Sequence, residues 1–214
     1  LTIRIPTQKS KDASRTQKLV FVSYLRPLEG HRMQNLKGSI PDPIGRTQLA
    51  SVRTKNTLVK VIVDASICEC SQLTTVIIGE GVKEIGKWAF MECITLQRIA
   101  IPPAVEVINE GAFKQCTQLT NVILGERVKR IGKEVFSQCE SLREIVIPPN
   151  VKTMMDRAFY RCAQLTTVIF GESVIFGDGL KEIGHGAFRE CTSLHEIVIP
   201  PAVKAIRGLA FYSS

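Results

Sequence analysis

Residues 142–162 read LREIVIPPNVKTMMDRAFYRC, and residues 73–93 read LTTVIIGEGVKEIGKWAFMEC. Both stretches start with Leu, continue with alternating apolar residues, and place a Phe and a Cys at the same offsets. A fixed period of 20 to 50 residues is the signature of a solenoid, in which each coil packs only against its neighbours. The Cys recurs every 23 residues, with one step of 29, at Cys70, Cys93, Cys116, Cys139, Cys162 and Cys191.

Each repeat contains a short segment in which apolar residues alternate with others, as in Val76-x-Ile78 and Ile145-x-Ile147. A period of two predicts a strand with one buried face. Equivalent strands of successive coils should then lie side by side in a parallel sheet. The segment follows a Leu in six repeats, at Leu73, Leu96, Leu119, Leu142, Leu165 and Leu194.

The rest of each repeat is a turn region. The strand ends at Gly-Glu or Pro-Pro, for example Gly79-Glu80, and an Ala-Phe pair follows. Phe90, Cys93 and Leu96 are spaced by three residues, which suits a short helical or 3₁₀ turn that faces inward. The sequence therefore predicts an α/β solenoid, with a parallel β-sheet on one face and short strands with 3₁₀ or helical turns on the other.

Charge divides the chain into two parts. Residues 1–57 show no period and hold 11 Lys and Arg against three acidic residues, whereas residues 58–214 are electrically balanced. Polar and breaker residues dominate the start of the first part, which is typical of disorder. We predict a basic, partly disordered N-terminal segment at 1–57 and a solenoid of 23-residue coils at 58–214.

Three departures from the period stand out. The match Leu58-x-x-Val61-x-Val63 starts a coil that lacks about eight residues, and we interpret it as an N-terminal cap. Six extra residues near 174–179 repeat the six before them and should form a loop. Ser214 stands where the pattern calls for a Cys.

These residues resemble the leucine-rich repeats of the BspA-like (bacterial surface antigen A) type. The consensus of that family runs roughly Leu-x-x-Ile-x-Ile-Pro-x-x-Val-x-x-Ile-Gly-x-x-Ala-Phe-x-x-Cys, and the likeness covers residues 58–214. The resemblance implies a curved solenoid whose parallel sheet lies on the concave side. It also implies a non-enzymatic protein, since members share no catalytic residues and many bacterial ones are surface or secreted adhesion proteins.

The cysteines are predicted to form a buried ladder, one per coil. Parallel Cβ vectors give poor disulfide geometry between adjacent coils, and a buried Cys behaves as a small hydrophobe. The irregular pair Cys68-x-Cys70 lacks the further ligands that a metal would need. Unbridged thiols and the absence of Asn-x-Ser/Thr sequons fit a reducing compartment, whereas the resembling family includes cell-surface proteins, so the compartment stays open.

No catalytic constellation is visible in the sequence. The three histidines, His31, His185 and His195, are scattered, and the Gly-rich phosphate loops and the His-Glu-x-x-His zinc motif are absent. We therefore predict a protein that is not an enzyme and has no cofactor, no metal and no small-molecule substrate.

The concave face is the candidate functional surface, because side chains between the buried strand residues should face outward. One column of these is aliphatic, and an exposed apolar row marks an interaction surface. The row has two alternative origins: β-branched residues suit strands intrinsically, or residues 1–57 or sequence outside this chain cover the sheet. The candidate partner-binding residues are Ile77, Arg98, Ala100, Asn121, Ile123, Glu144, Val146, Thr167, Ile169, Glu196 and Val198.

Two functions compete. The first is a non-catalytic binding module that presents its concave sheet to a protein or glycan. The alternative is a basic N-terminal arm at 1–57 that binds nucleic acid or an anionic membrane surface, with the repeats as a spacer. The open edge of the last coil could also pair edge to edge with another chain.

Overall fold

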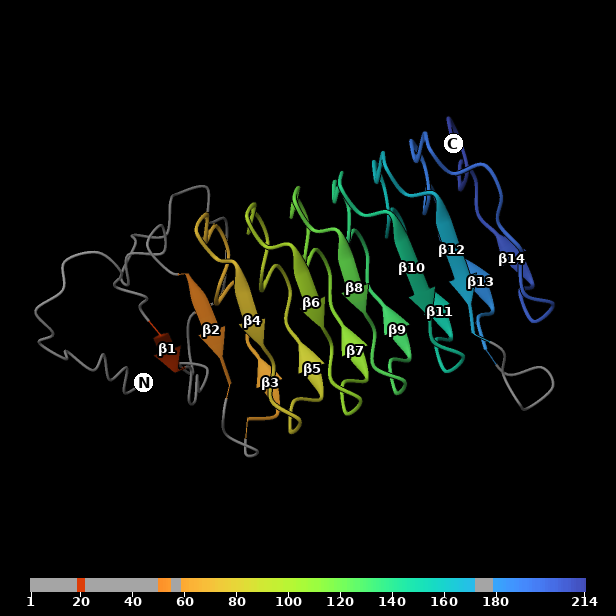
Figure 1. Cartoon of the computed structure of the whole chain (residues 1–214). Coiled ribbons are helices and arrows are strands. Elements are labelled where there is room, and N and C mark those ends of the chain that lie inside the picture. Colours follow the sequence, from red (N-terminus) through yellow and green to blue (C-terminus); the bar gives the residue numbers. More distant parts are fainter. Residues whose placement is uncertain (1–18, 22–49, 55–58, 172–178) are drawn as a thin grey trace, which may run out of the picture.

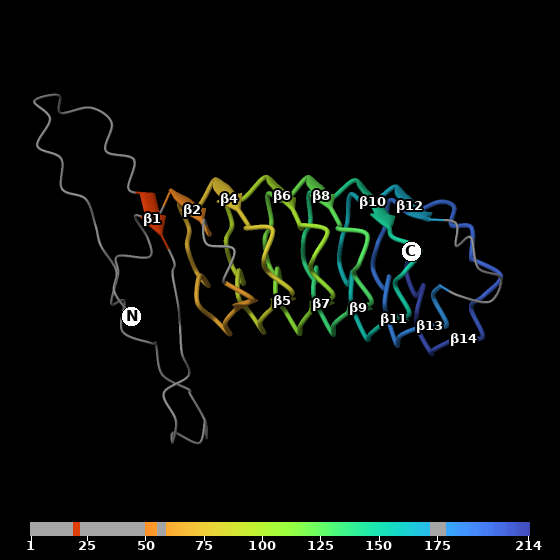
Figure 2. The ribbon, with the colours of Figure 1, turned by 90° about the horizontal axis from the view of Figure 1, so that it is seen from below.

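The structure is a computed structural model that describes residues 19–21, 50–54, 59–171 and 179–214. Fourteen strands in this part of the chain form three sheets, and every strand pair in them is parallel. Successive coils stack in a row along one axis (Figures 1 and 2). The predicted parallel solenoid of leucine-rich-repeat type is therefore confirmed.

The longer strands form one side of the stack, here called the long-strand wall. In its four-stranded sheet, equivalent residues of neighbouring coils face each other with an offset of 23, as Arg98 does with Asn121 and Glu144 with Thr167. The offset between Ser51 and Thr75 is 24. Figure 1 shows these strands side by side in chain order. The wall consists of a three-stranded sheet, β1 (Leu19–Phe21), β2 (Ser51–Arg53) and β4 (Thr75–Ile77), and a four-stranded sheet, β6 (Arg98–Ala100), β8 (Asn121–Ile123), β10 (Glu144–Ile147) and β12 (Thr167–Phe170).

The second side, the short-strand wall, is one seven-stranded sheet of two-residue strands. Its offset is also 23, except between β11 and β13, where Thr153 faces Glu182. The longer step absorbs the extra residues near 174–179, whose predicted loop lies, but for Gly179, outside the described residues. The strands are β3 (Val61–Ile62), β5 (Glu84–Ile85), β7 (Val107–Ile108), β9 (Arg130–Ile131), β11 (Thr153–Met154), β13 (Glu182–Ile183) and β14 (Ala205–Ile206).

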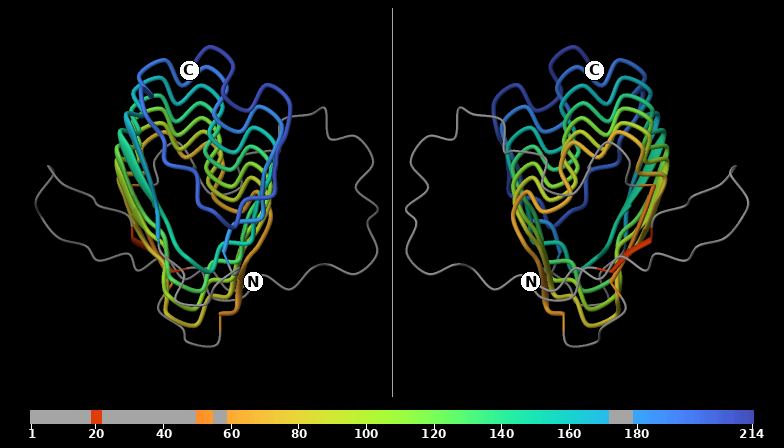
Figure 3. Two further views of the ribbon diagram at one scale, coloured as in Figure 1. Left: turned by 90° about the vertical axis from the view of Figure 1, so that its right-hand side faces the viewer. Right: turned by 90° about the vertical axis from the view of Figure 1, so that its left-hand side faces the viewer.

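A zigzag run of turns, here called the turn side, joins the two walls at the top of both end-on views in Figure 3. Each zigzag contains two residues with positive φ four positions apart, such as Trp88 (53°) and Glu92 (59°). This alternation points every second N–H at the next coil, so Trp88 N donates to Glu110 O at 2.9 Å and Phe90 N to Ala112 O at 2.8 Å. Bonds between coils thus replace the bonds within a helix.

The predicted helical or 3₁₀ turns, and with them the α/β class, are therefore not confirmed, because the described residues hold strands and turns only. The spacing of three residues between Phe, Cys and Leu is real, but turns produce it without a helix, with a left-handed residue such as Glu92 between the Phe and the Cys. Left-handed backbone at a non-glycine residue costs about 1–2 kcal/mol. The inter-coil hydrogen bonds offset this cost.

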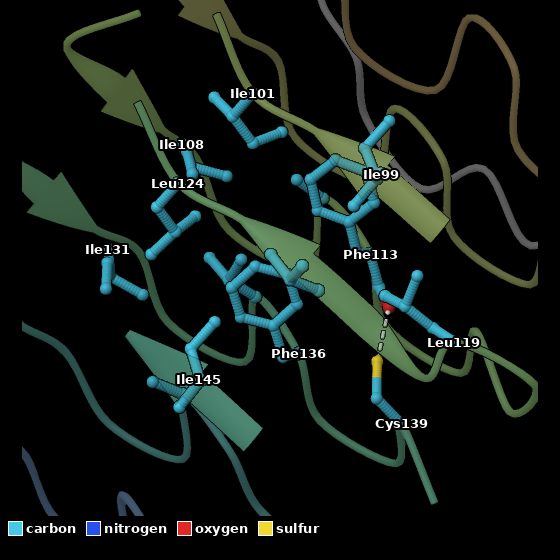
Figure 4. Close-up of a cluster of buried hydrophobic side chains, with 14 of the residues drawn as sticks. Ile99, Ile101, Ile108, Phe113, Leu119, Leu124, Ile131, Phe136, Cys139 and Ile145 are labelled. Carbon is cyan, nitrogen blue, oxygen red and sulfur yellow. Dashed lines mark hydrogen bonds between the residues drawn. The ribbon is translucent and has the colours of Figure 1, made fainter. Parts of the chain in front are cut away.

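The core lies between the walls and the turn side. Six phenylalanines stack from Phe90 to Phe211, and the rings of Phe113 and Phe136 have centroids 5.5 Å apart and lie 7° from parallel. Figure 4 shows these two rings with Ile and Leu side chains from both walls around them. Phe136, Cys139 and Leu142 are fully buried, which confirms that the Phe, Cys and Leu positions of the repeat face inward.

Two expected strands differ in the structure. The Leu58-x-x-Val61-x-Val63 match does not start a coil of the long-strand wall, because Val61 belongs to β3 of the short-strand wall and pairs with Glu84. The long-strand partner of β4 is instead β2, where Ser51 faces Thr75, so the ladder begins N-terminal to residue 58.

The second difference lies in the last coil. Residues 194–200 contain no strand, although Leu194 is buried and Ile197 and Ile199 pack against the core. The sequence pattern reports the inward residues correctly but not whether the ladder continues.

Candidate functional site

The aliphatic side chains on the outer surface of the long-strand wall form a continuous line. Ala100 faces Ile123 across β6 and β8, and Val146 faces Ile169 across β10 and β12. The exposed fraction is 45% for Ile77, 60% for Ile123, 46% for Val146 and 44% for Ile169. We call Ile77, Ala100, Ile123, Val146 and Ile169 the outward apolar row.

The strand period accounts for the exposure of these residues. Val122, Ile145 and Val168 alternate with them and are at most 7% exposed, because they pack against the core between the walls. Successive side chains of a strand point to opposite faces. Packing of the inward residues therefore fixes the orientation of the outward ones but does not require them to be apolar.

A polar column runs beside the outward apolar row. Arg98 faces Asn121, and Asn121 faces Glu144. All three side chains are exposed and make no hydrogen bond or ion pair within the part of the chain that the structure describes. Their donors and acceptors are thus available to another molecule. Thr75 and Thr167 continue the column at its two ends.

Threonines next to this column link neighbouring coils by hydrogen bonds. The hydroxyl of Thr120 donates to Gln97 O at 3.0 Å, and that of Thr166 donates to Arg143 O at 3.0 Å. The hydroxyl of Thr74 donates in the same way to Ala50 O at 3.1 Å. These bonds fix the spacing of the coils beside the polar column.

The short-strand wall is a contrast, because its polar side chains bind each other. Asn109 Nδ2 donates to Glu84 Oε1 at 2.7 Å, and the Arg130 guanidinium donates to Asn109 Oδ1 at 2.9 Å. Farther along, Arg207 donates to Glu182 at 2.6 Å, and this hydrogen bond lowers the pKa of the Glu182 carboxyl. These polar groups of the wall are already paired.

Nine of the eleven predicted site residues lie on strands of the long-strand wall and share its outer surface. Glu196 and Val198 do not, because residues 194–200 form no strand, although both side chains are exposed and Val198 is 74% exposed. The sequence prediction missed Arg53, which faces Ile77 from β2 and prolongs the row with a charge. Leu49-x-x-Val52, 24 residues before Leu73-x-x-Val76, was the available signal.

The cysteine side chains of the ladder are buried thiols. All seven cysteines lie in the described residues, where each is a buried thiol outside any disulfide. The thiol of Cys116 donates to Phe90 O and that of Cys139 to Phe113 O, both at 3.2 Å (Figure 4 draws the second). Burial raises the pKa of the Cys116 thiol to about 12 and that of Cys139 well above its ordinary value, because a buried thiolate would lose its hydration.

Two other kinds of feature are absent from the described ranges. They contain no group of three or more His, Cys, Asp or Glu side chains that could hold a metal ion. They also contain no helix long and apolar enough to cross a membrane.

Comparison with known proteins agrees with this geometry. The model of the BspA type leucine rich repeat region matches residues 60–176 and 171–214, in six copies. The T. pallidum leucine rich repeat protein TpLRR has a similar structure, with 27% identity and a TM-score of 0.62 over 70% of this chain and 67% of its own. No curated protein matches the chain.

Two other solved structures are longer than this chain. The leucine-rich repeat protein from Eubacterium ventriosum is 26% identical with a TM-score of 0.68, over 77% of this chain and 42% of its own. The one from Bacteroides ovatus is 25% identical with a TM-score of 0.58, over 76% of this chain and 46% of its own. This chain therefore spans less than half the length of either relative.

Proposed function

Because this chain belongs to the BspA-type leucine-rich repeat family, we propose that it is a non-catalytic binding module whose long-strand wall docks a protein partner. Repeat proteins commonly bind along an extended surface made by equivalent positions of successive coils. The proposal rests on one observation above all, the outward apolar row at 44% to 60% exposure of its large members.

The row would supply apolar area and the polar column would supply specificity. Scattered apolar residues are normal on a surface, but a contiguous line of them across five strands is the kind of patch that marks an interaction site. Arg98, Asn121 and Glu144 offer a cation, an amide and an anion at successive coils. A partner with complementary groups at the coil spacing would satisfy all three.

The intrinsic preference of Ile and Val for strands is the main competing origin of the row. This preference explains the residue types of Ile123 and Val146 equally well, but it does not require that they bind a partner. A binding measurement separates the two explanations. If strand preference alone explains the row, placing charged side chains in it should not change the affinity for any partner.

The test uses a partner isolated from the source organism and two matched double variants. Ile123→Glu with Val146→Glu places two carboxylates in the outward apolar row. Arg130→Glu with Thr153→Glu places two on adjacent strands of the short-strand wall, at side chains that are also exposed. We expect the first variant to lose binding at least tenfold and the second to bind as the parent does, with both keeping the melting temperature within a few degrees.

Equal loss in both variants, or none in the first, would contradict the proposal. A glycan partner stays a prediction, which an array of glycans would test with the same pair of variants. Pairing of another chain at the edge of β14 also stays a prediction, which the concentration dependence of the sedimentation mass would test.

The basic N-terminal arm remains the second candidate function, on the strength of its charge. Five of its 11 Lys and Arg lie in residues 1–18. If the arm binds nucleic acid or an anionic surface, affinity should fall steeply with added salt. Removal of residues 1–18, which leaves β1 and β2 in the chain, should then weaken binding severalfold because five of the 11 basic residues are lost, whereas docking on the long-strand wall would survive it.

A further inference from the structure

A cluster of arginines surrounds one tyrosine on the turn side of the last coils. The guanidinium carbons of Arg157, Arg161 and Arg189 lie 5.9, 5.1 and 5.9 Å from the centre of the Tyr160 ring. Glu190 is the carboxylate among them. We call these five residues the arginine–tyrosine cluster.

The coil geometry brings the cluster together. Arg157 and Arg161 are the two positive-φ residues of one zigzag, with Tyr160 between them. Their backbone N–H groups donate to His185 O and to Arg189 O of the next coil, both at 2.9 Å. Rigid inter-coil bonds therefore hold the three arginine backbones in place.

The same positions of the earlier coils do not carry such a group. The residues at the position of Tyr160 are Met91, Lys114 and Ser137, and those at the position of Arg161 are Glu92, Gln115 and Gln138. The repeat consensus therefore does not require an Arg or Tyr here. The cluster is a property of this part of the chain.

Positive charge in the cluster exceeds negative charge. Glu190 accepts from Arg161 at 2.6 Å, from Arg189 at 3.1 Å and from the Tyr160 hydroxyl at 3.3 Å. One carboxylate thus serves two guanidinium groups and a phenol.

Arg157 is the least satisfied of the three arginines. Its ion contact within the described residues is to Glu134 Oε1 at 3.7 Å, while the other oxygen of Glu134 binds the Lys114 ammonium at 2.6 Å. The side chain of Arg157 is 46% exposed and that of Arg189 is 31% exposed, so both can reach a solute.

We propose that the arginine–tyrosine cluster binds a tetrahedral oxyanion, a phosphate or sulfate group, between Arg157 and Arg189. A guanidinium presents planar, paired N–H donors that match such oxygens. A carboxylate offers two coplanar oxygens, whereas a tetrahedral anion offers oxygens in several directions and can accept from side chains on two coils. Cation–π contact with the Tyr160 ring helps to orient the guanidinium groups before the anion arrives.

This site is separate from the long-strand wall, and its existence does not depend on the function proposed above. Bound anion would relieve the repulsion between like charges in the cluster. It would therefore raise the stability of the last coils, through the usual linkage between ligand binding and folding.

The test titrates the 214-residue protein with inorganic phosphate, and separately with inorganic sulfate, at constant ionic strength set with chloride. We expect saturable binding by calorimetry and a rise in melting temperature. Arg157→Gln and Arg189→Gln should each weaken binding at least tenfold. Arg207→Gln is the matched control, because Arg207 is also exposed but is paired with Glu182 on the short-strand wall; it should bind as the parent does.

A second arm identifies the source of the anion. Flotation with phosphatidylcholine vesicles, with and without phosphatidic acid, tests a lipid phosphate. Binding to inorganic phosphate or sulfate without vesicle binding would support a soluble anion, and vesicle binding that Arg157→Gln removes would support a headgroup. Absence of saturable binding in both arms, or equal loss in Arg207→Gln, would overturn the proposal.

Discussion

The Ser214 hydroxyl donates a 2.6 Å hydrogen bond to the carbonyl oxygen of Phe188. This is the position at which the preceding coils place a Cys, and the Cys191 thiol makes the equivalent bond to Phe159 O at 3.1 Å. Ser214 thus continues the ladder of hydrogen bonds with a stronger donor than a thiol. The Cys position of the repeat is a hydrogen-bonding position as well as an apolar one.

The first prediction concerns this donor. Ser214→Ala should lower the free energy of unfolding by about 0.5–1.5 kcal/mol, because the bond to Phe188 is lost. Ser214→Cys is the control and should stay close to the parent, since a thiol makes this bond in the other coils. Urea denaturation measures both variants, and equal loss in the two would show that the hydrogen bond contributes nothing.

The second prediction concerns thiol reactivity. With the pKa of Cys116 raised to about 12 by burial, roughly one thiol in ten thousand would be ionised at pH 8. The folded protein should therefore react with a disulfide reagent only as fast as it unfolds, and all seven thiols should react in denaturant. Rapid reaction of the folded ladder at pH 8 would contradict the structure.

A third prediction tests the phenylalanine stack. Phe136→Ala should cost about 3–5 kcal/mol of unfolding free energy, as expected for a buried aromatic side chain. Lys133→Ala, in the same coil, should stay within about 0.5 kcal/mol, because Lys133 is exposed and its contact with Glu110 is 3.8 Å. A similar effect of the two substitutions would contradict the inward position of Phe136.

Gly111 allows a fourth prediction about the turn side. It has a φ of +61°, and a Cβ there would clash with the Trp88 ring, with Nε1 at 2.8 Å. Gly186 has nearly the same φ, +59°, but its Cβ would meet nothing closer than 3.5 Å. Both alanine variants carry the backbone cost of about 1–2 kcal/mol, so Gly111→Ala should be the less stable in thermal unfolding. A change in Trp88 fluorescence should accompany only that variant.

The fifth prediction is a pH dependence. Burial raises the pKa of the Glu134 carboxyl, but the hydrogen bond and charge of Lys114, with Lys133 and Arg157, outweigh it and leave the pKa below its ordinary value. A lowered folded-state pKa adds stability above the unfolded pKa and loses it as the pH falls through the folded one. Glu134→Gln should therefore be less stable than the parent at pH 7.

Urea midpoints across a pH series measure this effect. The difference between parent and Glu134→Gln should shrink as the pH falls from the ordinary carboxyl pKa of 4.5 through the lowered folded-state pKa of Glu134, below which both side chains are neutral. A difference that stays constant down to pH 2 would mean that the ion pair with Lys114 is not its cause.

The sequence predicts the inward and outward residues of this fold well. The repeat spacing and the strand period of two were sufficient to place Phe136 and Cys139 in the core and Ile123 on the surface. The buried and the exposed positions both follow from the side of the backbone to which each side chain points. Predicting them does not require knowledge of the hydrogen bonds between coils.

Features that depend on the neighbouring coil were not predictable. The residue types of Trp88 and Glu92 do not indicate a left-handed backbone. The hydrogen bonds to the next coil that stabilise this conformation form only when the coils are stacked. The absence of a strand at 194–200 was not predictable either, because Leu194-x-x-Ile197-x-Ile199 has the same pattern as the repeats that form one. The arginine–tyrosine cluster joins residues that are about 30 positions apart.

The most direct test of the proposed function is oxidative footprinting of the protein with and without its partner. Ile77, Ile123, Val146 and Ile169 should be modified in the free protein and protected at least severalfold in the complex, while exposed Met155 and Tyr212, outside the long-strand wall, should be unchanged. Protection of those two residues with an unprotected outward apolar row would contradict docking on the long-strand wall.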